Sequence, residues 1–208
     1  MAEIKSGAST DKLTVDPTSK AARVTLYDSA GRETSPQSKA TYVATGAYTP
    51  PATPTDMISI NGSATRNVRV MSIFVTTTTT AAGSIELKLV KRSTADTGGA
   101  FSPATMIPLD STDGAATANA GHWTTNPTQG TAVGNTNIMR MATPVAVPAS
   151  FAGIVEDAGK ELLPWSGNSL LDKPITLRGV AQGLFVHFGG AALVAGQTHA
   201  YRIVWTEE

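Results

Sequence analysis

The sequence predicts an all-β protein: an antiparallel β-sandwich, with a jelly roll as its best-populated version, preceded by an extended N-terminal arm. Three observations carry this prediction. Apolar and polar residues alternate in several short segments, which is the period of a half-buried strand. Turn-forming glycine, proline, asparagine and aspartate separate these segments. No long stretch repeats with the period of a helix.

Residues 1–54 are predicted to form the arm and a tether, and residues 55–208 the sandwich. The larger apolar groups of the first segment are few and scattered, namely Leu13, Val15, Val24, Leu26, Tyr27, Tyr42, Val43 and Tyr48. They are too few to offset the entropy lost when so many residues become ordered. The arm therefore needs a partner.

Within the arm, Val24 and Leu26 precede a tight-turn sequence at residues 28–31, which predicts a short strand. The prolines between residues 50 and 54 favour extended geometry and forbid a helix. This part is expected to act as a semi-rigid tether.

The domain opens with two apolar stretches, 57–60 and 68–75, on either side of Asn61-Gly62. Asn-Gly is a strong hairpin signal, so strand, turn and strand are expected here. In the next strand, Ile85, Leu87 and Leu89 alternate with mostly polar residues.

Shorter strand candidates follow at 105–109, 122–125 and 137–141, and three clearer ones close the chain at 175–178, 184–188 and 201–206. The stretch 145–165 fits either one helical turn or a strand and a loop, and both alternatives stay open. About eight to ten strands with turns at this spacing are typical of a sandwich.

Composition narrows the class of function. Sixteen basic and sixteen acidic residues cancel without forming a long run, so no nucleic-acid partner is expected. Charged residues make up only 15% of the chain, which leaves a hydroxyl-rich surface like that of β-rich assembly proteins. Cysteine is absent, and no apolar stretch has the length of a signal peptide or membrane span. We expect a protein made in the cytoplasm without a membrane partner.

Three histidines, His122, His187 and His199, are the candidates for a metal or acid–base site. If the last two strands form a hairpin, His187 and His199 have opposite parity and point to opposite faces of a sheet. They are then a poor metal pair, and structural roles are favoured.

The acidic residues Glu156, Asp157 and Glu161 are close in sequence and invite comparison with a calcium site or a glycosidase pair. No calcium-loop pattern accompanies them, and no nucleophile-elbow, zinc-protease or nucleotide-binding motif occurs. A solvated loop is the favoured interpretation. We expect no enzyme activity, no catalytic residue, no cofactor and no metal site.

Tryptophan side chains can stack on sugars, which makes Trp123, Trp165 and Trp205 candidates for carbohydrate contacts. Trp205 has the parity of a core residue. The other two lie near loops, where a contact between subunits is as plausible as a sugar.

Two segments carry a resemblance to a known group of proteins. They are KSGASTDKLTVDPTSKAARVTLYDSAGRE in the arm and ITLRGVAQGLFVHFGGAALVAGQTHAYRIVWTEE at the end of the domain. Both are similar to segments of virion structural proteins from tailed bacteriophages. Proteins of this layout include capsid cement or decoration proteins, which commonly form trimers at three-fold positions of the lattice.

The resemblance implies a non-enzymatic protein on the capsid exterior, a homotrimer whose partner is the major capsid protein and whose arm bridges capsomers. On this hypothesis the arm is anchored by Leu13, Val15, Val24, Leu26 and Tyr27, with Arg23 and Arg32 pairing with capsid carboxylates. The alternative is a tail or fibre component that recognises a host surface. An enzyme such as a polysaccharide depolymerase is a third possibility and would need a carboxylate cleft.

Overall fold

The chain divides into two units, Met1–Lys39 and Ala40–Glu208. The structure, a computed structural model, describes residues 14–15, 22–23, 39–143, 160–163 and 174–208. In the first unit the described residues are Lys39 and two short antiparallel strands, β1 (Thr14–Val15) and β2 (Ala22–Arg23).

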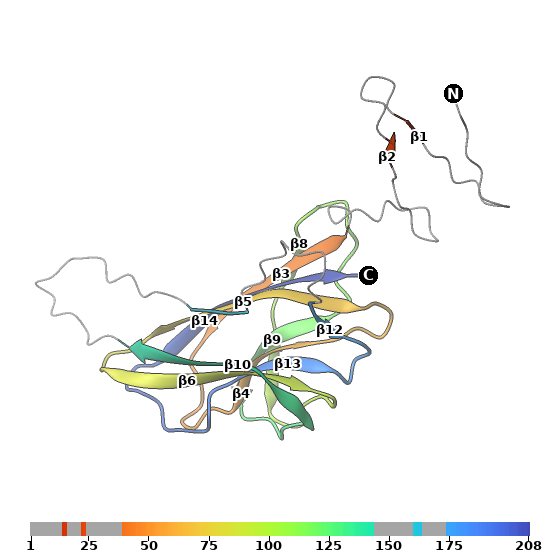
Figure 1. The fold of residues 1–208 in the computed structure, drawn as a ribbon. Helices are drawn as coiled ribbons and strands as arrows, with labels where there is room; N and C mark the ends of the chain where they lie inside the picture. Colours follow the sequence, from red (N-terminus) through yellow and green to blue (C-terminus); the bar gives the residue numbers. More distant parts are fainter. Residues whose placement is uncertain (1–13, 16–21, 24–38, 144–159, 164–173) are drawn as a thin grey trace, which may run out of the picture. The chain divides into compact units, whose positions relative to one another are not determined.

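The second unit is a sandwich of two antiparallel sheets, which confirms the predicted fold class (Figure 1). Its strands are β3 (Ala40–Tyr48), β4 (Asp56–Asn61), β5 (Val68–Thr78), β6 (Gly83–Arg92), β7 (Ala100–Pro103), β8 (Met106–Pro108), β9 (Asn119–Thr125), β10 (Ala132–Thr143), β11 (Lys160–Leu163), β12 (Ile175–Leu177), β13 (Gly183–His187) and β14 (Thr198–Glu207). Of the stretch 145–165 that sequence left open, the described part is the strand β11.

Sheet I has the order β11-β5-β14-β3-β8, with β12 also pairing with β5, and sheet II has the order β10-β6-β13-β4-β9-β7. From β3 to β6 the chain alternates between the two sheets, and it does so again from β13 to β14. As a result β14 lies between β3 and β5, and β13 lies between β4 and β6. The last two strands of the chain, β13 and β14, are thus central strands, one in each sheet.

The core fills the space between the sheets. Tyr42 of β3 and Trp205 of β14 are register partners, and their rings stack with centroids 5.7 Å apart. From sheet II, Ile58 and Leu184 belong to the same core and have no exposed surface. Alternate residues of strands such as β3 and β14 enter this core, as the period of two requires. Burial of this apolar surface is the main source of stability for the fold.

The boundary predicted at residue 54 is wrong, because residues 40–48 form β3 in sheet I, paired with both β14 and β8. Tyr42 and Tyr48 are buried core residues. The inward positions between them hold only small residues, Ala44 and Gly46, which hides the strand period in the sequence.

The predicted tether also belongs to the domain. The carbonyl oxygens of Ala52 and Pro54 accept hydrogen bonds from the backbone N–H groups of Leu193 and Gly190. The segment that follows β3 is therefore a loop fixed to the sandwich.

The predicted hairpin at Asn61-Gly62 does not form, because β4 and β5 belong to different sheets. The backbone N–H of Gly62 donates to the carbonyl of Gln182 at 2.9 Å. A Cβ at position 62 would lie 2.4 Å from the carbonyl oxygen of Gly179. Glycine is needed here for the close approach of two segments rather than for a tight turn.

Replacing Gly46 with alanine is expected to destabilise the sandwich. A Cβ at position 46 would lie 2.5 Å from the hydroxyl oxygen of Tyr201, whose buried ring covers this glycine. The ring would have to move, at a cost of roughly 1–3 kcal/mol in the free energy of unfolding. Urea denaturation measures the loss. Gly114→Ala is the matched control, because a Cβ at position 114 has no neighbour within 4 Å, and an equal loss in both variants would contradict the prediction.

Candidate functional site

The predicted partner-binding residues belong to the first unit. Val15 lies in β1 opposite Ala22, and Arg23 lies in β2 opposite Thr14. The remaining predicted anchors, Leu13, Val24, Leu26, Tyr27 and Arg32, lie outside the described residues. The structure therefore brings the backbones of two predicted positions, Val15 and Arg23, into one short pair of strands.

A buried ionic cluster joins sheet II to two loops, and we define it as Asp56, Arg92, Asp96 and His187. Arg92 donates from Nε to Asp56 Oδ2 at 2.6 Å and from Nη1 to the carbonyl of Gly130 at 2.7 Å. Arg92 Nε also lies 3.3 Å from Asp96 Oδ1, which accepts the N–H of Gly130 at 2.8 Å. His187 Nδ1 lies 2.7 Å from Asp56 Oδ1.

The two carboxyl groups of the ionic cluster differ in their affinity for a proton. Burial raises the pKa of Asp96 to about 7; the N–H of Gly130 opposes this rise, and the charge of Asp56 adds to it. Burial also disfavours the charged form of Asp56, but the hydrogen bond from His187 and the charge of Arg92 lower its pKa. Asp96 Oδ2 is buried without a hydrogen-bond partner. Asp56 is therefore the ionised partner of Arg92, and Asp96 is the group that takes up a proton.

A second buried carboxylate, Glu207 of β14, is only 3% exposed. Its oxygens accept the backbone N–H of Thr117 at 3.0 Å, that of Ala118 at 2.9 Å and Trp205 Nε1–H at 3.0 Å. The hydroxyl of Thr117 donates to Oε2 at 2.6 Å. Burial disfavours the charge, but the hydrogen bonds from Thr117, Ala118 and Trp205 lower the pKa of Glu207. The carboxylate thus fixes the segment before β9 to the end of β14.

Two histidines lie inside the sandwich. The ring of His122 stacks on Tyr48 with centroids 4.7 Å apart, and its Nδ1 lies 3.1 Å from the hydroxyl of Tyr201. His199 Nδ1 lies 2.7 Å from the hydroxyl of Thr77. Burial lowers the pKa of His122, and it lowers the pKa of His199 to about 4. Both histidines are neutral parts of the packing at neutral pH.

His187 and His199 do not come from one hairpin, because β13 lies in sheet II and β14 in sheet I. Their side chains nevertheless do not converge on one site, as expected. His199 is inside the sandwich, and His187 alternates with the inward-facing Val186 and so faces outward.

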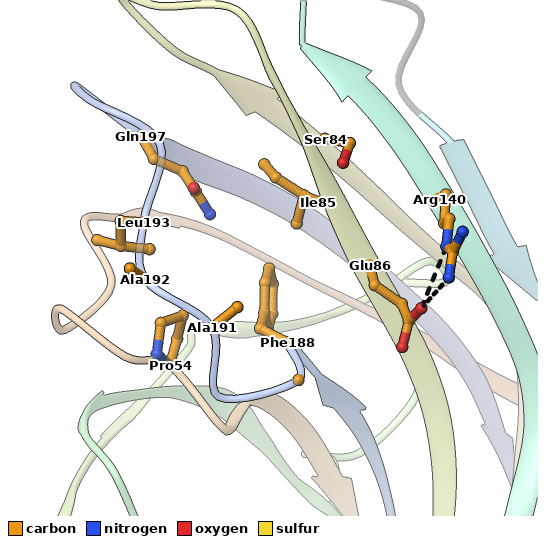
Figure 2. A pocket seen from close by; sticks show the side chains of 11 residues that line it. Pro54, Ser84, Ile85, Glu86, Arg140, Phe188, Ala191, Ala192, Leu193 and Gln197 are labelled. Atoms are coloured by element: carbon orange, nitrogen blue, oxygen red, sulfur yellow. Dashed lines mark hydrogen bonds and ion pairs between the residues drawn. The ribbon is translucent and has the colours of Figure 1, made fainter.

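A surface cavity of about 300 Å³ lies between β6 and the loop that follows β13 (Figure 2). Figure 2 shows the apolar side chains of Pro54, Phe188 and Leu193 on one side and the Glu86–Arg140 pair on the other. Arg140 Nε and Nη2 each donate to Glu86 Oε2 at 3.2 Å. An apolar wall with a charged rim suits a small mixed ligand or a side chain of a partner.

The tryptophans and acidic residues that the sequence offered as candidates for sugar, calcium or glycosidase sites lie as follows. Trp205 is a core residue, and Trp123 is 7% exposed with its ring 5.0 Å from that of Phe101. Trp165, Glu156 and Asp157 lie outside the described residues, and Glu161 is described only as a backbone position of β11. In the described ranges no group of three or more histidine, aspartate and glutamate side chains has the arrangement of a metal site. The same ranges hold no helix long and apolar enough to cross a membrane.

Sequence reasoning missed the ionic cluster and Glu207. Asp56 and Arg92 stand at the ends of their strands, where a charged residue normally meets solvent. Their burial depends on loops that come from elsewhere in the chain, which a local pattern does not reveal. Comparisons with protein-family models, curated proteins and solved structures found no match for this chain.

Proposed function

We propose that the chain is a non-enzymatic structural protein of a bacteriophage virion, a cement or decoration protein that binds the outside of the capsid and stabilises the shell. The two segments that resemble virion proteins of tailed phages suggest the class. The observation that carries the proposal is the division of the chain after Lys39. The described core lies in Ala40–Glu208, and on this proposal the first unit serves attachment.

The short strands of the first unit support a docking role. β1 and β2 have two residues each, and so short a hairpin is at best marginally stable in water. Pairing with a strand of the major capsid protein would add backbone hydrogen bonds and buried apolar area. In a homotrimer, three such arms would raise the effective concentration of each attachment.

The finer fold that goes with this proposal is a jelly roll. Support comes from the strand order β3-β14-β5-β11 in sheet I and β4-β13-β6-β10 in sheet II. Two sheets of four strands match the eight-stranded double Greek key, in which successive strands alternate between the sheets except at one pair, here β6 and β10. On this assignment β7, β8 and β9 are an insertion between β6 and β10.

A tail or fibre component that recognises a host surface is the alternative function. The cavity of Figure 2 favours it, because an apolar wall beside an exposed ion pair is suited to a small surface group of a host. The position of the protein in an intact particle separates the two functions. Copies spread over the shell support the cement role, and copies confined to one vertex support the tail role.

Deleting residues 1–39 is expected to leave a folded sandwich that no longer sediments with capsids, because the attachment strands are gone and the described core is intact. Near-ultraviolet circular dichroism checks the fold, and cosedimentation with capsids that lack this protein measures binding. Undiminished binding of the folded truncated protein would refute arm-mediated docking. If the truncated protein does not fold, competition between the full chain and a peptide of residues 1–39 provides the same test, with competition expected.

A further inference from the structure

Two loops cross the face of sheet II that points away from sheet I, and we call them together the flap. They are residues 93–99, between β6 and β7, and residues 126–131, between β9 and β10. Thr97 and Thr128 exchange backbone hydrogen bonds of 2.9 and 2.7 Å, and the N–H of Ser93 donates to the carbonyl of Thr131. The two loops therefore behave as one piece.

Two buried apolar side chains of sheet II, close to the arginine that contacts the flap, lie outside the main core. Phe185 and Val90 are register partners on β13 and β6, and they are 0% and 5% exposed. They alternate with inward-facing residues such as Val186 and Leu89, so they face away from sheet I. The guanidinium carbon of Arg92 lies 5.6 Å from the centroid of the Phe185 ring.

The ionic cluster attaches the flap to the sheet. Asp96 and Gly130 belong to the flap, and both contact Arg92 of β6. Gln129, also in the flap, places its Nε2 3.4 Å from Asp56 Oδ1. These contacts connect both loops to β4 and β6.

The charges at this attachment do not balance when both carboxyl groups are ionised. Asp56 from β4 and Asp96 from the flap face a single guanidinium, that of Arg92. His187 from β13 bonds to Asp56, and the amine of Lys88 on the neighbouring strand β6 is 2.9 Å from Glu86 rather than in this cluster. A proton on one carboxyl group removes the excess negative charge.

We propose that the flap is a proton-controlled latch: Asp56 and Asp96 hold one proton between them, and loss of this proton releases the flap and uncovers Phe185 and Val90. The inference stands apart from the proposed function. Below neutral pH the flap is closed over the sheet. At mildly alkaline pH the open state is more populated and offers an apolar strip that the closed state hides.

The sign of the effect follows from linkage. Burial raises the pKa of Asp96 from 3.8 to about 7, so the closed state holds a proton that the open state has already lost at neutral pH. The contribution of this proton to closure is complete at low pH and is lost as the pH rises through about 7. Between about pH 6 and pH 8 the equilibrium constant for opening should rise about tenfold.

Hydrogen exchange on the full chain, read by mass spectrometry and corrected for the intrinsic effect of pH, tests the latch. In the wild-type protein, peptides that cover the flap should exchange about tenfold faster at about pH 8 than at about pH 6. Asp96→Asn should abolish this dependence, and the matched control Asp110→Asn, on an exposed loop, should keep it. A wild-type flap with the same protection at both pH values, or an unchanged dependence in Asp96→Asn, would overturn the proposal.

A second measurement covers the case in which Asp96→Asn does not fold. Carbon-13 carboxyl shifts of the wild-type protein report each aspartate directly. A carboxyl midpoint near neutral pH, assigned to the Asp56–Asp96 pair, supports the latch. Titration of every aspartate below about pH 5, the range of unperturbed carboxyl groups, contradicts it.

Discussion

Replacing Glu207 with alanine is expected to lower the free energy of unfolding by roughly 3–5 kcal/mol at neutral pH. The substitution leaves the N–H groups of Thr117 and Ala118 and the indole N–H of Trp205 without their acceptor. Since Trp205 and Ala118 are buried, water does not replace the lost carboxylate easily. Each unsatisfied buried donor costs about 1–3 kcal/mol.

Urea denaturation of Glu207→Ala, with Glu207→Gln beside it, measures this cost. Glutamine keeps one acceptor oxygen and the shape of the side chain, so Glu207→Gln should lower the free energy of unfolding less than Glu207→Ala does. Glu86→Gln is the control for loss of a surface carboxylate, because Glu86 pairs with the partly exposed Lys88 and with Arg140, whose side chain is largely exposed, and such pairs contribute little. A Glu207→Ala protein as stable as the Glu86→Gln protein would contradict the prediction.

The effect of Glu207 should also depend on pH. Its pKa is lowered in the folded chain from an ordinary value of 4.5, so its stabilising contribution is present above about pH 4.5 and is lost as the pH falls through the folded-state value. The stability difference between wild-type protein and Glu207→Gln should therefore shrink in acid. A difference that stays constant down to about pH 3 would show that the charge of Glu207 is not responsible.

The strands were predictable from sequence where one face meets the core and the other meets solvent. β5, β6 and β14 alternate clearly and were predicted at nearly their observed positions. β3 was missed because Ala44 and Gly46 weaken its apolar period. Which strands are neighbours was not predictable, since β14 pairs with β3, more than a hundred residues away in the chain.

The buried charges were hidden for a different reason. Arg92 and Glu207 have ordinary polar positions at strand ends, and the residues that satisfy them come from distant loops, such as Gly130 for Arg92 and Thr117 for Glu207. The local alternation of apolar and polar residues predicts which face of a strand is buried in the sheet. It does not predict which distant loop packs against that strand.

Replacing Arg92 with alanine is expected to cost roughly 3–5 kcal/mol, because it leaves the buried carboxylate of Asp56 without its countercharge. Packing over Phe185 is lost as well. Arg92→Lys keeps the charge but not the planar guanidinium that reaches both Asp56 and Gly130. Its loss in the free energy of unfolding should therefore lie between zero and that of Arg92→Ala. Arg140→Ala is the matched control, because the side chain of Arg140 is 79% exposed, and little change is expected there.

The double variant Arg92→Ala/Asp96→Asn separates charge from packing. Without Arg92, the buried carboxylates of Asp56 and Asp96 repel each other, so removing the charge of Asp96 should restore part of the lost stability. In the intact chain the pKa of Asp96 is raised to about 7, and the charge of Arg92 opposes that rise, so the loss of Arg92 raises this pKa further. Stability is therefore best compared at about pH 9 or above, where more of Asp96 is ionised in the single variant. If the two substitutions are simply additive, Asp96 does not respond to the charge of Arg92. If Asp96→Asn restores stability at high pH but not at about pH 5, the proton on Asp96 removes the same repulsion that the guanidinium of Arg92 neutralises in the wild-type protein.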